Sequence, residues 1–110
     1  IVLSQITIYL ATSPKSNTSY MAINKAQSHI KQTGDLSIPL NLRNAPTKLM
    51  KELDYGKGYK YAHDYPNNFA QQEFLPTEIS NSVYYEPGDN PPELKIKERL
   101  KSLWKDKYGY

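Results

Sequence analysis

Cysteine is absent from the 110-residue sequence. Its absence excludes disulfide bonds, thiolate zinc sites and cysteine nucleophiles, and it fits a reducing compartment. A long hydrophobic run is also absent, because the most apolar stretch, residues 1–11, includes Ser, Gln and Thr and falls well short of the ~20 residues that span a bilayer. No basic segment precedes this stretch, so it does not have the form of a signal peptide. We therefore expect no membrane partner.

Internal repeats, low-complexity tracts and an initiating methionine are absent as well. The sequence opens on Ile1 inside a stretch that we interpret as helix, so we expect residues 1–110 to be a single domain taken from a longer protein. Phenylalanine and tryptophan are scarce, whereas there are ten tyrosines. Tyrosine joins a large apolar ring to a hydroxyl that needs a partner, so it favours half-buried surfaces and interfaces.

The net charge is a modest +3, but the charges are arranged in blocks. Residues 62–92 carry five acidic side chains and neither Lys nor Arg, while the segments 1–42, 43–61 and 93–110 are each net basic. Such blocks can neutralise one another within the fold or meet across copies in an oligomer. A nucleic-acid binder is expected to have a one-sided basic face, which a net charge of +3 alone does not indicate.

Two helices are predicted in the first third of the chain. Residues 1–12 are apolar on most sides, which is typical of a buried helix. Asn17 is a suitable N-cap for a second helix over residues 18–32, and Gly34 can adopt the left-handed conformation that ends a helix. The apolar residues expected on the buried stripe of this second helix are Tyr20, Ile23 and Ile30, with Ala22 and Ala26 alongside.

Two further helices are predicted later in the chain. Asn44 is expected to cap a short third helix with Pro46 in its first turn, and Gly56 to close it. Asn90 is followed by two prolines and Glu93, a pattern that predicts a capped start for the last helix, with Glu93 completing a capping box. The apolar face expected on this last helix consists of Leu94, Ile96, Leu100, Leu103 and Trp104.

The remaining segments lack sustained periodicity. Residues 36–42 alternate apolar and polar side chains around Pro39, which predicts an extended strap or edge strand. Residues 57–88 are punctuated by proline, glycine and asparagine but contain regularly spaced apolar anchors, which indicates a loop wrapped over the core. The fold class expected is therefore all-α, or mainly helical, with a long structured irregular loop between the third and last helices.

The stretch YGKGYKYAHDY, Tyr55–Tyr65, is the part of the chain in which site chemistry could be sought. A P-loop requires G-x-x-x-x-G-K-[ST] after a strand, and Gly56-Lys57-Gly58 meets neither condition. His63 and Asp64 are the sole candidates for acid–base work, but adjacent residues rarely form a catalytic pair and no serine stands out as a nucleophile. The acids and histidines lack the spacing of a metal site. We expect no enzyme activity, cofactor or metal in this chain.

Nucleic-acid binding is favoured more than catalysis in this stretch. Lys57, Tyr59, Lys60 and Tyr61 alternate charges and rings, as do the stacking surfaces of single-strand binders. The acidic block that follows would repel a phosphate backbone, and tyrosines at these positions could equally pin the loop to the helices. Both interpretations, packing and contact with DNA or a partner, stay open on the residues alone.

The run LRNAPTKLMKELDYGKGYKYAHD, Leu42–Asp64, resembles the C-terminal domain of the RarA/MgsA family, the replication-associated recombination protein A group of AAA+ ATPases related to clamp loaders. The motifs YLATSPKSN (Tyr9–Asn17), QEFLP (Gln72–Pro76) and YYEP (Tyr84–Pro87) follow in the order and spacing expected of that family. The resemblance covers essentially the whole chain. It supports an origin in a longer protein.

The resemblance implies a function that the residues alone do not indicate. It implies that this chain is part of a helical C-terminal domain for homotetramer assembly, and that an ATPase module binding ATP and Mg²⁺ lies N-terminal to it. It also implies that the parent protein is a cytoplasmic, nucleoid-associated, DNA-stimulated ATPase acting at stalled or damaged replication forks. The partners it implies are further copies of the chain, DNA forks, ends and single strands, and single-stranded-DNA-binding protein.

The resemblance also assigns positions, which we expect to serve packing or an interface. Those matching the two short family motifs are Lys15, Ser16, Asn17, Arg43, Asn44, Pro46 and Thr47, and those matching the signature loop are Gly56, Gly58, Tyr59, Tyr61, His63 and Asp64. Three positions depart from the family pattern: Asn41 stands where His is expected, Ser13 where Ala is usual and Asp54 where Gly is usual. Asp54 weakens the case for a glycine-dependent turn at that point.

Overall fold

A computed structural model describes all residues from 1 to 110 and contains helices but no strand. Its four α-helices are α1 (Val2–Thr12), α2 (Thr18–Thr33), α3 (Lys48–Glu52) and α4 (Pro91–Trp104). Short 3₁₀ turns occur at η1 (Leu40–Leu42), η2 (Ala62–Asp64), η3 (Pro66–Asn68) and η4 (Thr77–Ile79). The all-α class and the long irregular segment between α3 and α4 are thereby confirmed.

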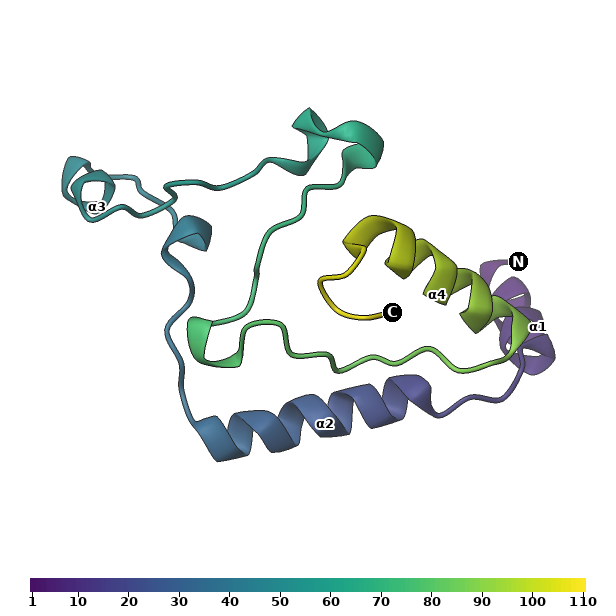
Figure 1. The fold of residues 1–110 in the computed structure, drawn as a ribbon. Helices are drawn as coiled ribbons and strands as arrows, with labels where there is room; N and C mark the ends of the chain where they lie inside the picture. Colours follow the sequence, from purple (N-terminus) through teal and green to yellow (C-terminus); the bar gives the residue numbers. More distant parts are fainter.

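The chain is open rather than compact. Its radius of gyration is 18.0 Å, whereas a compact domain of this length is expected near ~13 Å. Figure 1 shows α1, α4 and the start of α2 at one end, while α3 and the middle of the loop extend away at the other. Ala70 and Glu93 are the two buried residues. The helices therefore do not enclose a common hydrophobic core.

Helix α1 forms where it was predicted, but the expectation that it is buried is wrong. None of its residues is buried, and Leu3, for example, is 80% exposed. The helix satisfies its aliphatic hydroxyl groups internally, because the hydroxyls of Ser4, Thr7 and Thr12 donate to carbonyls three or four residues earlier. No other helix packs on it, so an apolar surface that local periodicity marks as buried stays uncovered.

Helix α2 also forms as predicted and ends at Gly34, whose positive φ of 68° is accessible to glycine but whose ψ of −160° differs from the left-handed helical cap that was expected. Asn17 occupies the N-cap position, yet its side chain makes no capping hydrogen bond. The expected burial is wrong for the large members of the stripe, because Tyr20, Ile23 and Ile30 are all more than half exposed. The less exposed positions at helical spacing are the two alanines of that stripe, Ala22 and Ala26, together with Thr18, His29 and Thr33.

The segment 80–90 runs alongside α2 (Figure 1). Tyr84 Oη lies 2.8 Å from His29 Nδ1, and the Lys25 ammonium lies 2.9 Å from the Glu86 carboxylate. Small alanine side chains on this face allow the segment 80–90 to approach the helix closely, which bulky isoleucines would prevent. The polar and small face of α2 is therefore the packed one, and its apolar face is left open.

Helix α3 starts later than predicted. Thr47, not Asn44, caps it, because the Thr47 hydroxyl oxygen accepts from the Met50 amide at 3.3 Å. Pro46 restricts the residue before it to extended conformations, so a helix cannot begin at Asn44. The helix ends at Glu52, and Gly56 contributes to the turn beyond it rather than closing it. The strap before α3 forms the 3₁₀ turn η1 and no edge strand.

Helix α4 begins as predicted, since the Asn90 side chain accepts from the Glu93 amide at 3.1 Å. Its apolar face is only partly covered, with Leu94 and Ile96 exposed. At its C-terminal end the Trp104 and Phe69 rings pack edge to face, with their centroids 4.8 Å apart. The loop therefore does wrap onto α4 through Phe69, although Phe74, another expected anchor, is half exposed.

Candidate functional site

The signature loop meets one of the two short motifs. The Arg43 guanidinium donates to the Tyr55 hydroxyl at 3.1 Å and lies over the Tyr55 ring, 5.1 Å from its centroid. A Cβ atom on Gly56 would lie 3.1 Å from the Arg43 carbonyl, and Gly56 has a φ of 73°, so glycine suits this close approach. Residues 41–45 and Tyr59 complete the walls of a hollow of about 390 Å³ at this junction.

Most amides of this turn donate to backbone carbonyls. Gly56 N–H donates to the Leu40 carbonyl at 2.7 Å, Lys57 N–H to that of Asp54, and Tyr59 N–H to that of Gly56. A phosphate cradle requires several unpaired amides directed at one point. The turn instead fastens the loop to the strap that precedes α3.

The two lysines of the loop are held by oxygen acceptors but remain exposed. Lys57 pairs with Asp54 at 3.1 Å, and the Lys60 ammonium donates to the Gln71 carbonyl at 3.0 Å. The Gln72 side chain bonds to both the amide and the carbonyl of Lys60 and so joins the loop to the returning chain. Exposed pairs of this kind contribute at most about 1 kcal/mol, so the lysines can exchange their partners at low cost.

Two tyrosines of the loop face solvent. Tyr59 is 53% and Tyr61 55% exposed, whereas Tyr55 is less exposed and its hydroxyl accepts from Arg43. The Tyr61 ring contacts the His63 ring at a centroid distance of 5.1 Å. No hydrogen bond joins the His63 and Asp64 side chains, so the geometry of an oriented acid–base pair is missing.

The other short motif lies elsewhere, at the start of α4. Ser16 donates to the Glu93 carboxylate at 2.9 Å, and Thr18 and Asn90 also donate to it. The Tyr85 hydroxyl adds a fourth side-chain donor at 3.2 Å. Glu93 therefore connects the turn after α1, the start of α2, the segment 80–90 and α4. In a capping box its side chain would instead accept from the Asn90 backbone amide.

This environment favours the ionised carboxylate. The hydrogen bond from Thr18, supported by those from Ser16, Asn90 and Tyr85, outweighs burial and lowers the pKa of the Glu93 carboxyl. Burial and the neighbouring Glu93 carboxylate raise the pKa of the Tyr85 hydroxyl. A Cβ on Gly88 would lie 2.7 Å from a Glu93 oxygen, so a larger residue there would displace this carboxylate from its donors.

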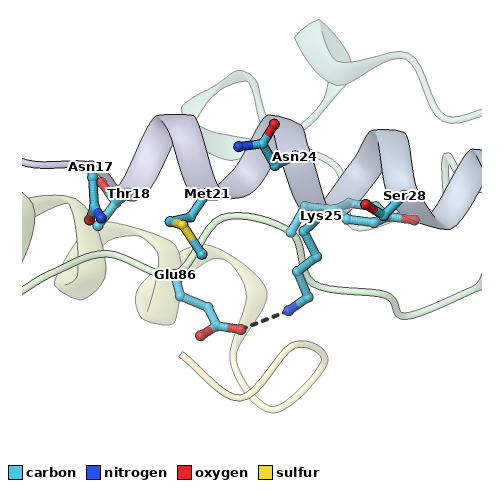
Figure 2. A pocket seen from close by; sticks show the side chains of 8 residues that line it. Asn17, Thr18, Met21, Asn24, Lys25, Ser28 and Glu86 are labelled. Carbon is cyan, nitrogen blue, oxygen red and sulfur yellow. Dashed lines mark hydrogen bonds and ion pairs between the residues drawn. The ribbon is translucent and has the colours of Figure 1, made fainter.

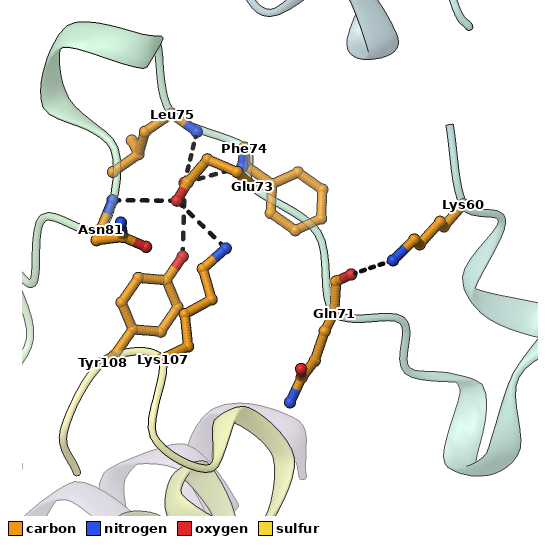
Figure 3. A network of polar contacts seen from close by, with 8 residues as sticks. All are labelled: Lys60, Gln71, Glu73, Phe74, Leu75, Asn81, Lys107 and Tyr108. Carbon is orange, nitrogen blue, oxygen red and sulfur yellow. Dashed lines mark hydrogen bonds and ion pairs between the residues drawn. The ribbon is translucent and has the colours of Figure 1, made fainter. Parts of the chain in front are cut away.

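A second carboxylate organises the loop and the C-terminal residues. Glu73 accepts from the amides of Leu75 and Asn81 at 3.0 Å each and pairs with the Lys107 ammonium at 3.2 Å (Figure 3). Burial raises the pKa of Glu73, but these hydrogen bonds and the lysine charge outweigh it, so the pKa lies below its ordinary value. Lys107 also lies over the Trp104 ring, 5.5 Å from its centroid.

Sequence reasoning missed both carboxylate centres as connectors of distant segments. Glu93 carried a local signal, its third position in a helix, but nothing in the sequence indicated its distant donors. Glu73 lies in a stretch without periodicity and carried no signal. The predicted contact residues Lys57, Tyr59, Lys60 and Tyr61 share one loop, and the structure does not bring Lys15, Ser16 and Asn17 to them.

A wide hollow of about 570 Å³ lies along α2 beside the segment 80–90 (Figure 2). Met21 and Tyr84 are its two hydrophobic lining residues, and the Lys25–Glu86 ion pair crosses it. No group of three or more acidic or histidine side chains is arranged to hold a metal ion. None of the helices combines the length and apolar character required to cross a bilayer.

Comparison with known proteins identifies the family to which this chain is similar. The family model described as "MgsA AAA+ ATPase C terminal" matches residues 1–104. Replication-associated recombination protein A of Haemophilus influenzae is 47% identical over 102 residues, which are 92% of this chain and 23% of that protein. The protein of the same name from Escherichia coli K12 is 46% identical over 99 residues, 89% of this chain and 22% of its own length.

The similarity extends to a eukaryote, since ATPase WRNIP1 of Dictyostelium discoideum is 31% identical over 96 residues, 86% of this chain and 11% of that protein. These matches and the all-α fold define the class: a helical domain of the kind found at the C-terminal end of AAA+ ATPases. This chain belongs to the MgsA AAA+ ATPase C-terminal family. It spans less than a quarter of the length of the bacterial relatives named above.

Proposed function

We propose that this chain is the assembly domain through which a clamp-loader-related AAA+ ATPase forms a homotetramer. The supporting observation is the uncovered apolar surface of α1 and α2, on which nearly every large side chain is at least half exposed. Soluble monomers rarely leave contiguous apolar patches larger than a few hundred Å². Association of copies would cover this surface.

The wider role is proposed from family membership. We place the parent protein in the cytoplasm with the nucleoid, acting in replication-fork maintenance, recombination and DNA repair, with DNA and single-stranded-DNA-binding protein as partners. ATP and Mg²⁺ would be bound by an ATPase module outside these 110 residues. The turn at Gly56–Gly58 is a poor candidate for nucleotide, because the Gly56 and Lys57 amides are already bonded to carbonyls.

The assembly proposal is tested by the solution mass of the full-length protein. Multi-angle light scattering should give the mass of four copies, and dilution should release smaller species only at low concentration. A mass of one copy over a wide range of concentrations would contradict the proposal. Removal of residues 1–110 should abolish the assembly without abolishing ATP hydrolysis, which separates the two modules.

A second candidate function is contact with DNA through Lys57, Tyr59, Lys60 and Tyr61. It is supported by the exposure of both rings and by the weak, exposed pairing of both lysines. Single-strand binding that uses these residues should weaken steeply with salt, because phosphate contacts release counterions. The double variant Lys57→Ala, Lys60→Ala of the full-length protein should bind less tightly and with a shallower salt dependence. Unchanged binding would exclude this function for the loop.

A further inference from the structure

The tyrosines of the signature loop differ in whether their ring faces are free. The Tyr55 ring is covered by the Arg43 guanidinium, and the Tyr61 ring contacts the His63 ring. The Tyr59 ring is 53% exposed, and neither a ring nor a cation packs on it. Tyr59 is also one wall of the hollow of about 390 Å³ beside η1. A free aromatic face at a hollow is a platform on which a planar group can stack.

The other walls of this hollow carry hydrogen-bonding groups that the chain leaves free. The carboxamides of Asn41 and Asn44 form no hydrogen bond within the chain, and the backbone amides of Asn44 and Ala45 donate to no carbonyl. A carboxamide has donors and an acceptor side by side. The edge of a nucleobase has the same combination, and asparagine binds adenine through two such bonds. The hollow therefore matches a planar group with a polar edge.

The charge of the hollow favours an anion. Arg43 is the one charged residue in its lining, and no carboxylate lines it. The guanidinium uses Nε for the Ile38 carbonyl and one terminal nitrogen for the Tyr55 hydroxyl, so further N–H donors stay free. Lys57 directly follows the lining residue Gly56, and its side chain is 75% exposed. A base in the hollow would therefore have cations available for its phosphate.

We propose that the hollow binds one unpaired nucleotide of a single-stranded nucleic acid, with its base stacked on Tyr59. The carboxamides of Asn41 and Asn44 bond to the edge of the base, and Arg43 and Lys57 pair with its phosphate. The volume of the hollow lies within the ~300–1,000 Å³ of pockets that hold small ligands. The inference rests on the proposed contact of the loop with DNA and adds a pocket that reads a base. The faces of bases in a duplex are covered by their neighbours, so a duplex does not fit.

Binding of labelled ten-nucleotide single strands to the full-length protein tests the stacking. Tyr59→Ala should raise the dissociation constant about tenfold through the loss of one base–aromatic stack. Tyr59→Phe is the matched control, because it keeps the ring and removes a hydroxyl that forms no hydrogen bond in the chain. The control should bind like the unsubstituted protein. An alanine variant that binds as tightly as the phenylalanine variant would overturn the inference.

Base preference tests the two asparagines. Strands made only of adenine, cytosine or thymine nucleotides are compared with each other. Asn41→Ala with Asn44→Ala should bring the three dissociation constants closer together, because alanine cannot bond to a base edge. Lys57→Ala should instead weaken all three strands alike and make the salt dependence shallower. Preference ratios that are the same in the asparagine variant and the unsubstituted protein would contradict the placement of the base.

Three outcomes separate this inference from the proposed DNA contact. Unchanged binding in both Tyr59→Ala and the double variant Lys57→Ala, Lys60→Ala contradicts both proposals. Weakened binding in the lysine variant, with unchanged binding in Tyr59→Ala, contradicts the nucleotide site alone. Deoxyadenosine monophosphate that displaces a labelled strand as effectively as an unlabelled strand at the same nucleotide concentration would show that the hollow takes free nucleotides, which also overturns the inference.

Discussion

Ser16 donates its hydroxyl to the Glu93 carboxylate at 2.9 Å, although the two residues are 77 positions apart. Ser16 belongs to the turn between α1 and α2, and Glu93 to the first turn of α4. Their contact joins the two ends of the chain at the end of the molecule where α1, α4 and the start of α2 lie (Figure 1). The family motif that contains Ser16 therefore has a structural role here, as the donor to a carboxylate at the start of the last helix.

Replacing Glu93 with glutamine tests this role. The amide offers one acceptor oxygen in place of two and brings an NH₂ group against the donors of Ser16, Thr18 and Asn90. We expect Glu93→Gln to lower the thermal unfolding midpoint by several degrees. The control is Glu98→Gln, because Glu98 is exposed on the same helix and forms no ion pair. Equal midpoints for the two variants would contradict the role given to Glu93.

The helices could be predicted where their signals are local. Asn90 and the two prolines after it define the start of α4 within four residues, and the structure confirms that start. The start of the third helix was predicted wrongly because Asn44 and Thr47 are both good N-caps. The choice between them depends on the restriction that Pro46 places on the residue before it. Such competition between nearby caps is decided by backbone sterics that residue preferences do not express.

Burial could not be predicted in the same way. Tyr20, Ile23 and Ile30 have helical spacing and were expected inside with the two alanines beside them, yet α2 turns only the alanines, together with His29, toward residues 80–90. Periodicity identifies an apolar face but not the partner that covers it, and in this chain no segment does so. Glu73 and Glu93 were missed as connectors because their donors come from segments far away in sequence.

Stability should depend on pH through these two carboxylates. The pKa values of Glu73 and Glu93 are lowered from an ordinary value of 4.5 in the folded chain. The unfolded chain therefore binds protons first as the pH falls, so the stabilisation is complete well above 4.5 and is lost as the pH drops through the folded-state values. Urea unfolding followed by the fluorescence of Trp104, the single tryptophan, should give a midpoint that is steady near neutral pH and falls below about pH 5.

A double variant with both carboxylates replaced provides the comparison for this pH dependence. Glu73→Gln with Glu93→Gln should have a lower midpoint at neutral pH and a flatter profile in the acid range. If the double variant lost stability as steeply as the parent, other carboxylates would be responsible for the acid transition.

The Lys107 ammonium should stabilise the packing of the C-terminal residues against the loop. It pairs with Glu73 at 3.2 Å, with both side chains about three-quarters buried, and lies 5.2 Å from the centre of the Tyr108 ring. Lys107→Met keeps the apolar stem but removes the charge, and we expect a loss of about 1–2 kcal/mol in the free energy of unfolding. Lys95→Met, at an exposed position on α4, should change it by less than about 0.5 kcal/mol. A loss no larger than that of the control would show that the pair contributes little.

The conformation of Asp54 yields a prediction about the turn after α3. Asp54 has a φ of 63°, so the left-handed turn exists at the position where the family resemblance leads us to expect glycine, and aspartate adopts it. Aspartate and asparagine tolerate this region better than branched side chains do. We therefore expect Asp54→Gly to change the free energy of unfolding by less than about 0.5 kcal/mol, and Asp54→Val to lower it by about 1–2 kcal/mol. Chemical denaturation of the two variants measures the difference, and Lys57→Ala corrects for the lost Asp54–Lys57 pair. If glycine and valine gave the same stability, the turn would not require a left-handed residue at this position.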